Sequence, residues 1–436
     1  MTGSSNIRKG PLVIALMTVI FLAAMESTIT VLAAPIITRD LSGFDLMSFM
    51  FSSYLLTAAV ITPVFGWLAD RYGRKRMLTI GIVLFLGGSA LCGLSQDMMM
   101  LIAFRGVQGL GAGSIFSLTY TIAGDAFPIE SRAGILGALG SVWGVAGLLG
   151  PVLGGFLIET LSWHWVFFIN IPLGVPCIIL LRLSLKEQAS PSAQSHETAS
   201  WSGLVTKMTV FVNIVSFLTC IVMQGLDVYL ALYLQNVLGH SAMVAGLALL
   251  PMTFSWLAVS YIYGKLLVRV SGKALVLAAG LWQVLCCALF VFMDVTTSLP
   301  VAILFIFLTG FGLGGLMTST TVIIQESVGY HQRGTAVGIN SFIKTMGQTL
   351  GITALGAVFN LHLASYFAGV GLPGINPSNL YQGGENTALV DDALLANALD
   401  SGISVLFVIL LVVTAVLVVA AFFMPRVRLE STNNAS

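Results

Sequence analysis

The sequence predicts an all-α membrane protein with twelve transmembrane helices arranged as two six-helix bundles. Hydrophobic residues make up 57% of the 436 positions and charged residues only 8%, a balance that is not typical of soluble domains. The apolar residues also fall in runs of about twenty, the length of helix that spans a bilayer core of ~30 Å. A membrane barrel would instead show alternating segments of ~10 residues. The net charge of +1 indicates no nucleic-acid partner.

Polar residues separate the apolar runs into twelve expected spans. From the N-terminus these are residues 12–34, 46–68, 77–95, 98–124, 133–160, 163–185, 208–236, 242–268, 273–294, 299–325, 332–360 and 402–424. The segment "KEQASPSAQSHETAS" after the sixth span is rich in Ser and Ala, as flexible linkers are. We therefore expect an N-terminal bundle over 1–185, a cytoplasmic linker over 186–207, and a C-terminal bundle over 208–436 with an external loop at 361–401.

Lys and Arg residues predict the orientation of these spans, because cytoplasmic loops carry an excess of both. Of the Lys and Arg residues counted in the loops, only Arg39 falls on the expected outer side of the membrane. The other side holds Arg8, Lys9, Arg71, Arg74, Lys75, Arg76, Arg132, Lys186, Lys207, Lys265, Arg269, Lys273, Arg333, Arg426 and Arg428. Both termini are therefore expected in the cytoplasm, with the protein in the cytoplasmic membrane.

The sequence gives no sign of a cofactor or of catalytic residues. The five cysteines lie within apolar runs and form no CxxC pair, so neither a metal site nor a disulfide framework is indicated. No GxxxxGK[ST] phosphate loop and no HExxH motif occur. We expect no metal, no ATP use and no enzyme activity.

Two ionisable residues are expected at similar depth in the membrane. Glu26 lies ~21 Å along the first span from its inner end, and Arg105 lies ~10 Å into the fourth span from its outer end. In a core of ~30 Å these depths nearly coincide. Each charge would cost ~2.5–3.5 kcal/mol in lipid, so both are expected to face the bundle interior. Three arrangements fit: a static buried ion pair, an Arg105 bonded to backbone carbonyls, or a site where Arg105 modulates the protonation of Glu26.

Asp227 is the other acid well inside an apolar span. It lies ~28 Å along the seventh span, near the outer end, where water has access. It is expected either to bond a neighbouring helix or to act as an electrostatic filter for cations, as a weaker member of the proton-coupling set.

The loop "GWLADRYGRKRML" at 66–78 joins the second and third spans. Gly66 permits close helix approach, Gly73 permits a tight turn, and the basic residues hold the loop in the cytoplasm. Asp70 can stabilise the positive N-terminal end of another helix, by ~0.3–1 kcal/mol when exposed and up to ~2 kcal/mol when partly buried. The alternative is a basic loop that only sets topology.

The fifth span has a face of small residues at helical spacing, which permits close helix packing, and a proline that can kink it. This face comprises Gly147, Gly150, Pro151, Gly154 and Gly155. Packing alone and a gating role both fit the pattern.

Aromatic and amide side chains near mid-span are candidates to line a substrate cavity. For the aromatic residues, core packing or lipid exposure is the alternative, whereas a buried amide needs a partner. The candidates are Tyr54, Gln108, Tyr120, Trp143, Gln224, Tyr229, Phe254 and Asn340.

These motifs together resemble the major facilitator superfamily. "GWLADRYGRKRML" resembles its signature loop, with Gly66, Asp70, Arg71, Gly73, Arg74 and Lys75 in place. "LIAFRGVQGLGAG" resembles its fourth-helix motif and "GVAGLLGPVLGG" its antiporter fifth-helix motif. "AAMESTITVLAAP" and "WHWVFFINIP" resemble first- and sixth-helix motifs of its drug:proton antiporter branches, one of which usually has fourteen spans, an Asp at the position of Glu26 and an Arg at that of His164.

The resemblance implies that the contact of Asp70 locks the outward-facing state. It also implies a monomeric, proton-coupled antiporter that exports amphipathic, often cationic, drugs by alternating access, as in antibiotic resistance. Glu26 is then the site where a proton and a substrate exclude one another. A weak echo of "GWLADRYGRK" in "GKLLVRVSGK" (264–273) also favours two repeated bundles of a transporter. The alternatives are an exporter of a specific metabolite, a sodium-coupled carrier, a channel and an intramembrane enzyme.

Overall fold

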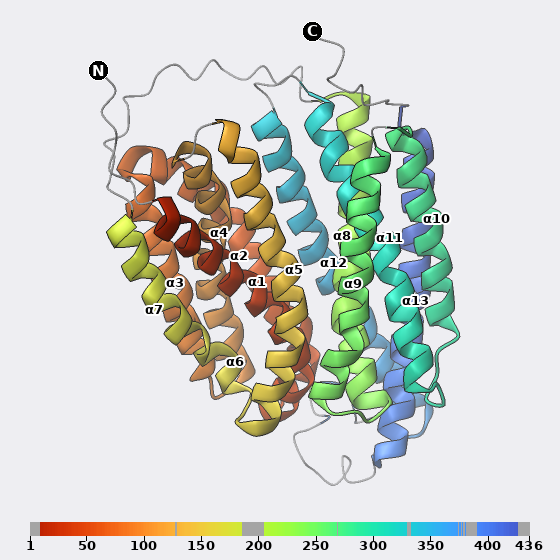
Figure 1. The fold of residues 1–436 in the computed structure, drawn as a ribbon. Helices are drawn as coiled ribbons and strands as arrows, with labels where there is room; N and C mark the ends of the chain where they lie inside the picture. The colour runs from red at the N-terminus through yellow and green to blue at the C-terminus, as the bar shows by residue number, and fades with distance from the viewer. Residues whose placement is uncertain are drawn as a thin grey trace, which may run out of the picture. The chain divides into compact units, whose positions relative to one another are not determined.

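The computed structural model describes residues 9–126, 129–184, 205–267, 269–328, 333–373 and 390–425, together with 375, 377 and 380. The described chain forms two compact helical units (Figure 1). Unit 1 contains α1 to α7 and the segment Ser241–Gly246. Unit 2 contains α8, the rest of α9 from Leu247, and α10 to α13.

Unit 1 is organised around α1 and α4. Helix α1 packs against α5 and α7, and α4 packs against α2 and α3. The bounds are α1 Lys9–Asp40, η1 Phe44–Leu46, α2 Met47–Tyr72, α3 Arg74–Gly93, α4 Met98–Ala126, α5 Ile129–Thr160, α6 His164–Phe168 and α7 Asn170–Ser184. Most of α1 between Leu12 and Thr38 is buried, as expected for a helix that is apolar on every face.

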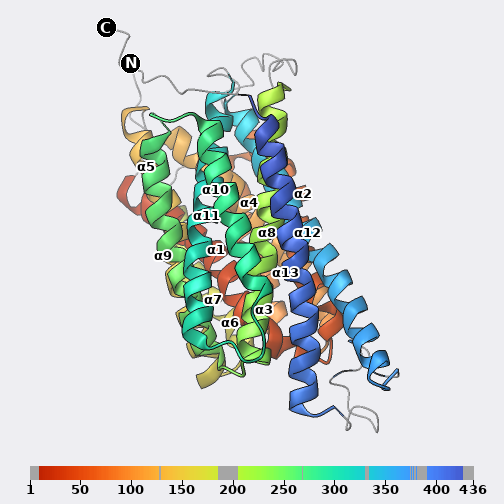
Figure 2. The same cartoon turned by 90° about the vertical axis from the view of Figure 1, so that its right-hand side faces the viewer.

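Unit 2 repeats much of this arrangement. Helix α8 packs against α12 and α13, and α10 packs against α11 and α13; Figure 2 shows α13 running beside α12. The bounds are α8 Lys207–Leu232, a π-helical turn η3 Tyr233–Val237, α9 Ala242–Leu266, α10 Gly272–Val291, α11 Leu299–Glu326, α12 Arg333–Gly369 and α13 Asp392–Phe423.

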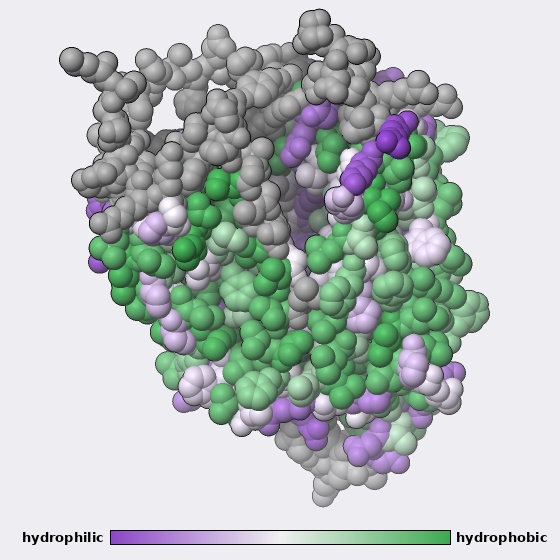
Figure 3. Space-filling model, viewed as in Figure 1, coloured by the Kyte–Doolittle hydropathy of each residue, from purple (hydrophilic) through white to green (hydrophobic). Residues whose placement is uncertain are grey.

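Twelve helical stretches of the described chain are long and apolar enough to cross a membrane, with α6 and α7 together forming one of them. No strand occurs among the described residues. The predicted all-α membrane fold with twelve spans is thus confirmed. Figure 3 shows hydrophobic side chains covering the visible helix faces, with hydrophilic ones gathered toward the helix ends.

The sixth span, predicted over 163–185, runs from His164 to Ser184 as two consecutive helices. Helix α6 ends at Phe168 and α7 begins at Asn170, and Ile169 between them keeps helical backbone angles. Pro172 lacks the N–H that would bond the carbonyl of Phe168, so one hydrogen bond of the helical ladder is missing here. Asn170 is the first residue of α7.

The segment 361–401, which the sequence predicted as a loop, is helical at both ends. Helix α12 continues to Gly369 and α13 begins at Asp392. The side chain of Asp391 caps α13, because one of its oxygens accepts a bond from the backbone N–H of Leu394 at 2.7 Å. Hydropathy alone missed these turns, since they extend past the apolar run.

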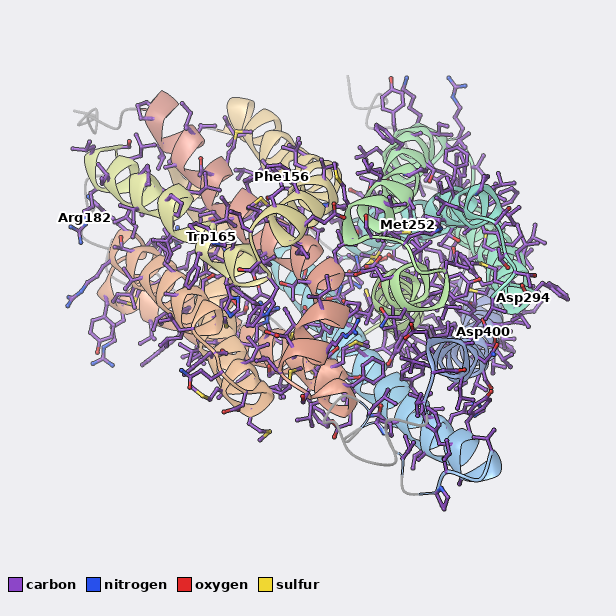
Figure 4. All side chains as sticks on the ribbon, turned by 90° about the horizontal axis from the view of Figure 1, so that it is seen from below. Phe156, Trp165, Arg182, Met252, Asp294 and Asp400 are labelled. Carbon is purple, nitrogen blue, oxygen red and sulfur yellow. The ribbon has the colours of Figure 1, made fainter. Side chains whose placement is uncertain are left out.

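At the same end of unit 2, the short loop after α10 is organised by Asp294. Its Oδ1 accepts bonds from the backbone N–H and the hydroxyl of Thr296 at 2.8 and 2.7 Å. These bonds from Thr296, with a weaker contribution from Thr297, hold the pKa of Asp294 below its usual range. Figure 4 shows Asp400 of α13 close to Asp294.

Glycines set the closest helix contacts in unit 1. A Cβ on Gly150 of α5 would collide with Thr28 of α1, and one on Gly154 would press against Ile29. Likewise, Gly109 of α4 faces the backbone carbonyl of Tyr54 in α2. Small residues therefore let these helix pairs approach backbone to backbone.

Unit 2 repeats this glycine pattern at matching places. Gly347 of α12 faces the carbonyl of Phe217 in α8, and Gly351 faces Ile221. Gly310 of α11 faces the carbonyl of Met252 in α9, as Gly109 faces α2. The two units thus share the way in which their helices pack.

Candidate functional site

Polar side chains from five helices of unit 1 meet around Glu26. We call this group the charge cluster. It consists of Glu26 and Thr30 on α1, Tyr54 on α2, Ser89 on α3, Arg105 and Gln108 on α4, and Asn170 on α7, with Phe167 of α6 beside them. Every member is buried.

Glu26 and Arg105 form a fully buried ion pair. The Nη1 atom of Arg105 donates to Oε1 of Glu26 at 2.6 Å, and both residues are 1% exposed. Thr30, one turn further along α1, donates its hydroxyl to the same carboxylate oxygen at 3.0 Å. The structure thus brings together the two residues whose predicted depths coincide.

The second oxygen of Glu26 is held from α7. The side-chain amide Nδ2 of Asn170 donates to Glu26 Oε2 at 2.5 Å and lies 2.9 Å from the hydroxyl of Ser89. Ser89 in turn donates to the carbonyl of Phe167 at 2.8 Å, one residue before the end of α6. The carboxylate therefore accepts hydrogen bonds on both oxygens, from three different side chains.

Arg105 has further neighbours that compensate its charge. Its Nη1 donates to Oε1 of Gln108 at 2.7 Å, and its Nε to the carbonyl of Met50 at 3.4 Å. The guanidinium lies over the ring of Tyr54 at 4.3 Å and near that of Phe167 at 5.9 Å, both within reach of a cation–π interaction. Tyr54 and Gln108 therefore contact Arg105 directly.

Three polar atoms of the charge cluster have no hydrogen-bond partner among the described residues. They are the hydroxyl of Tyr54, Nε2 of Gln108 and Oδ1 of Asn170. Leaving such a group unsatisfied costs ~1–3 kcal/mol. The charge cluster therefore contains three buried polar atoms that could each form a further hydrogen bond.

The loop at 66–78 turns at Gly73, whose φ of 96° favours glycine. Lys75, at the start of α3, donates to the carbonyl of Arg182 at the end of α7 at 2.9 Å. Arg71 lies near the rings of Trp67 and Tyr72. The side chain of Asp70 lies outside the described residues, so its predicted lock contact is not located.

The small-residue face of α5 has two glycines in contact with α1. Gly150 and Gly154 face that helix, and Pro151 and Gly155 are buried as well. Gly147 is only partly buried. Pro151 lies inside α5 without ending it.

The predicted substrate-lining residues divide by exposure. Tyr120, Trp143 and Phe254 are 36%, 42% and 56% exposed, and the ring of Trp143 stacks on Phe116 at 5.4 Å. The others have little or no exposed surface; they are Tyr54, Gln108, Gln224, Tyr229 and Asn340. Only the exposed members could touch a ligand in this conformation.

Two of these buried residues lie in well-defined settings within unit 2. Tyr229 packs its ring against Phe359 with centroids 5.3 Å apart. Asn340 of α12 donates from Nδ2 to Asn213 at 2.8 Å and to Ser216 at 2.9 Å, both on α8. The Asn340 amide thus joins α12 to α8.

Asp227 lies five residues before the end of α8 and is half-buried. Among the described residues its carboxylate has no hydrogen bond and no ion pair, unlike that of Glu26. Asp227 thus belongs to unit 2 and, in the described part of the chain, has none of the kinds of partner that hold Glu26 within unit 1.

A family model described as the Major Facilitator Superfamily matches residues 16–352, most of the chain. The chain belongs to this superfamily. The resemblance that the motifs carry is thus confirmed. Membership makes this a multi-pass membrane transporter, which agrees with the twelve spans.

Two relatives within the superfamily are named for drug transport. The multidrug transporter protein MdtP of Bacillus subtilis (strain 168) is 30% identical over 405 residues, which covers 80% of this chain and 75% of MdtP. Multidrug resistance protein 3 of the same organism is 29% identical and covers 96% of both chains. This chain is thus a superfamily transporter with multidrug efflux homologues.

Among solved structures, a bacterial homolog of the human lysosomal transporter Spinster is similar to this major facilitator chain throughout. In its inward-facing and occupied conformation it matches with a TM-score of 0.80 at 18% identity, over 97% of both chains. This likeness shows the fold.

Sequence reasoning missed Asn170, Ser89 and Thr30 as members of the charge cluster. Thr30 could have been found, because it follows Glu26 by four residues and so shares its helix face. Ser89 and Asn170 gave no such signal, since their positions depend on how α3 and α7 pack. The sixth-helix motif contained Asn170, but nothing in it singled out that residue.

Proposed function

We propose that this chain is a proton-coupled antiporter that exports amphipathic, often cationic, drugs across the cytoplasmic membrane by alternating access. The observation that carries the proposal is the buried Glu26–Arg105 pair with its three further hydrogen-bonding partners. A carboxylate at this depth is costly to retain unless it has a task, and proton exchange is a task that only an ionisable group performs.

Charge balance gives the pair a means of exchanging protons for cations. With Glu26 ionised, its charge and that of Arg105 cancel. A proton on Glu26 leaves the Arg105 cation without a counter-charge, with only neutral partners among the described residues: the oxygens of Gln108 and Met50 and the rings of Tyr54 and Phe167. The protonated cluster then repels a cationic drug, and a bound cation in turn disfavours protonation. Proton and drug thereby exclude one another.

The remaining predicted residues have supporting roles in this proposal. Asp70 and its loop stabilise one conformation, and Gly150 and Gly154 let α5 and α1 pack tightly. Tyr120, Trp143 and Phe254 offer exposed aromatic surface to an amphipathic drug. Both termini lie in the cytoplasm, and the protein works as a monomer.

Transport by the purified protein in liposomes tests the proposal. With an imposed pH gradient, we expect the protein to accumulate a cationic drug against its concentration gradient, whereas a sodium gradient at equal pH should have no effect. Glu26→Gln keeps the shape of the side chain but cannot titrate, and should abolish uphill transport. Asp97→Asn is the matched control, since Asp97 lies in the loop before α4 and only caps Met100.

Either of two results would contradict the proposal. Uphill drug transport by Glu26→Gln under the pH gradient would remove Glu26 from proton coupling. Transport that follows the sodium gradient would favour a sodium-coupled carrier. A panel of cationic, neutral and anionic compounds would reveal an exporter of one metabolite, because a single compound would then be transported.

A further inference from the structure

Asn170 is bonded in a way that suits only one protonation state of Glu26. Its Nδ2 donates to Glu26 Oε2 and to Ser89, so both of its N–H groups are used. Its Oδ1 is buried and has no partner among the described residues. The amide therefore holds the carboxylate with one end and leaves the other end unused.

The ionised carboxylate of Glu26 requires hydrogen-bond donors, whereas its protonated form requires an acceptor for the O–H group. Its Oε1 already faces donors from Arg105 and Thr30, and an arginine cannot accept a hydrogen bond. The proton therefore belongs on Oε2, the oxygen that faces Asn170. The resulting O–H needs an acceptor, which an NH₂ group cannot provide and the unused Oδ1 can.

We propose that Asn170 is a positioning residue that sets the proton affinity of Glu26 by exchanging the two ends of its amide. The NH₂ end binds the carboxylate, and rotation about the Cβ–Cγ bond presents the carbonyl end to the protonated acid. No covalent bond changes apart from the O–H bond of Glu26. The proposal rests on the proposed function, because it describes how the same acid binds its proton.

The position of Asn170 lets the exchange of its amide ends affect other helices of unit 1. Asn170 is the first residue of α7, next to Ile169, where α6 and α7 meet. Trp163, the residue before α6, donates from Nε1 to Asp40, the last residue of α1, at 2.8 Å. Glu26 and Asp40, both on α1, thus bond the sixth span within its length and at its start.

Infrared difference spectroscopy of the detergent-purified protein tests the proposal without transport. The carbonyl stretch of protonated Glu26 is assigned by its absence in Glu26→Gln, and its intensity is followed against pH. Asn170→Leu keeps the branched shape but removes both ends of the amide. A hydrogen bond to a charged group stabilises more than one between neutral groups, so loss of both amide ends should raise the Glu26 midpoint by the difference, about one pH unit.

A second variant and a control support the measurement. Ser89→Ala leaves every donor to Glu26 in place but removes the acceptor that holds the NH₂ end, so it should raise the midpoint by less than Asn170→Leu. Gln283→Leu removes a fully buried amide of unit 2 whose Oε1 also has no partner among the described residues, and should leave the midpoint unchanged. In the unmodified protein, an amide carbonyl band should shift at the Glu26 midpoint and vanish in Asn170→Leu.

Each outcome of the infrared measurements either supports or overturns the proposed role of Asn170. Equal Glu26 midpoints in the unmodified protein and Asn170→Leu overturn the proposal. So does the absence of an amide band that titrates with Glu26, or of any Glu26 band across the pH range. If Asn170→Leu does not fold, Ser89→Ala and the amide band give the answer. Failure of the proposed function has a different signature, in which Glu26 titrates as expected but a pH gradient drives no drug transport.

Discussion

Unit 1 and unit 2 pack their helices in the same way but differ in charge at matching positions. Gly150 and Gly154 contact Thr28 and Ile29, as Gly347 and Gly351 contact α8 at Cys220 and Ile221. When the two units are aligned on these glycine contacts, Thr28 corresponds to Cys220. Glu26, two residues earlier, then corresponds to Leu218. Arg105 precedes Gly109 by four residues, as Ile306 precedes Gly310. Unit 2 therefore has two apolar residues where unit 1 has its ion pair.

The difference in charge between the two units bears on why unit 1 has the Glu26–Arg105 pair. Unit 2 shows that this helix arrangement forms without the pair. A buried ion pair is moreover weak evidence for stability, because the cost of removing two charges from water offsets their attraction. A functional reason for retaining Glu26 and Arg105 in unit 1, such as the proposed proton exchange, is therefore favoured over a structural one.

The largest expected effect comes from giving unit 1 the residues of unit 2. Arg105→Ile alone leaves Glu26 buried without its cation and should cost about 3–5 kcal/mol of folding stability. The double variant Glu26→Leu with Arg105→Ile should recover part of that loss, because no unpaired charge stays buried, although Asn170, Thr30 and Gln108 lose hydrogen-bond partners. Unfolding of the purified variants in detergent measures the stability, and a pH gradient in liposomes measures the transport, which should be absent from both.

This test can separate the structural and functional interpretations of the pair. A double variant as unstable as Arg105→Ile would mean that the pair holds unit 1 together. A stable double variant that still exports drugs under a pH gradient would mean that the proton site lies elsewhere.

A smaller effect is expected where the two glycine contacts differ. A Cβ on Gly347 meets the backbone carbonyl of Phe217, which cannot move aside, whereas one on Gly150 meets the hydroxyl end of Thr28. Gly347→Ala should therefore cost about 1–3 kcal/mol in stability, and Gly150→Ala less. Unfolding in detergent checks both, with Gly338→Ala as control because open space surrounds that position. Equal costs for Gly150→Ala and Gly347→Ala would show that backbone and side-chain obstacles are equivalent here.

The smallest effect is expected at Asp227, the acid of unit 2 without a partner among the described residues. Asp227→Asn should leave stability nearly unchanged and reduce export of a cationic drug several-fold, with little change for a neutral drug. Export of matched cationic and neutral compounds, together with proton exchange without drug, checks this. If both drug classes lose activity equally, Asp227 has a structural role and not that of a cation filter.

The twelve spans and the depth of Glu26 and Arg105 could be predicted from the sequence because both follow from the thickness of the bilayer. Neither prediction requires knowledge of which helices touch. The ends of α12 and α13 could not be predicted, since Asp391 caps a helix that extends beyond the apolar run. A hydropathy pattern does not reveal such helical turns, because they lie outside the apolar run.

The roles of Asn170, Tyr54 and Gln108 show where sequence reasoning stops. Tyr54 and Gln108 were predicted to line a substrate cavity, and the structure places both against Arg105. Asn170 was not selected at all. In each case the partner lies on another helix, and its identity depends on the rotation of two packed helices about their axes, which composition and spacing do not determine.

The glycine contacts of α1 with α5 also have a mechanical consequence. Gly150 and Gly154 are one helical turn apart and fit around Thr28 and Ile29, so a slide of α5 along α1 by one turn in one direction would bring Ile158 to the place of Gly154. Steric contact opposes sliding in that direction. We therefore expect α5 and α1 to move together in that direction, so that a motion of α5 carries Glu26 with it.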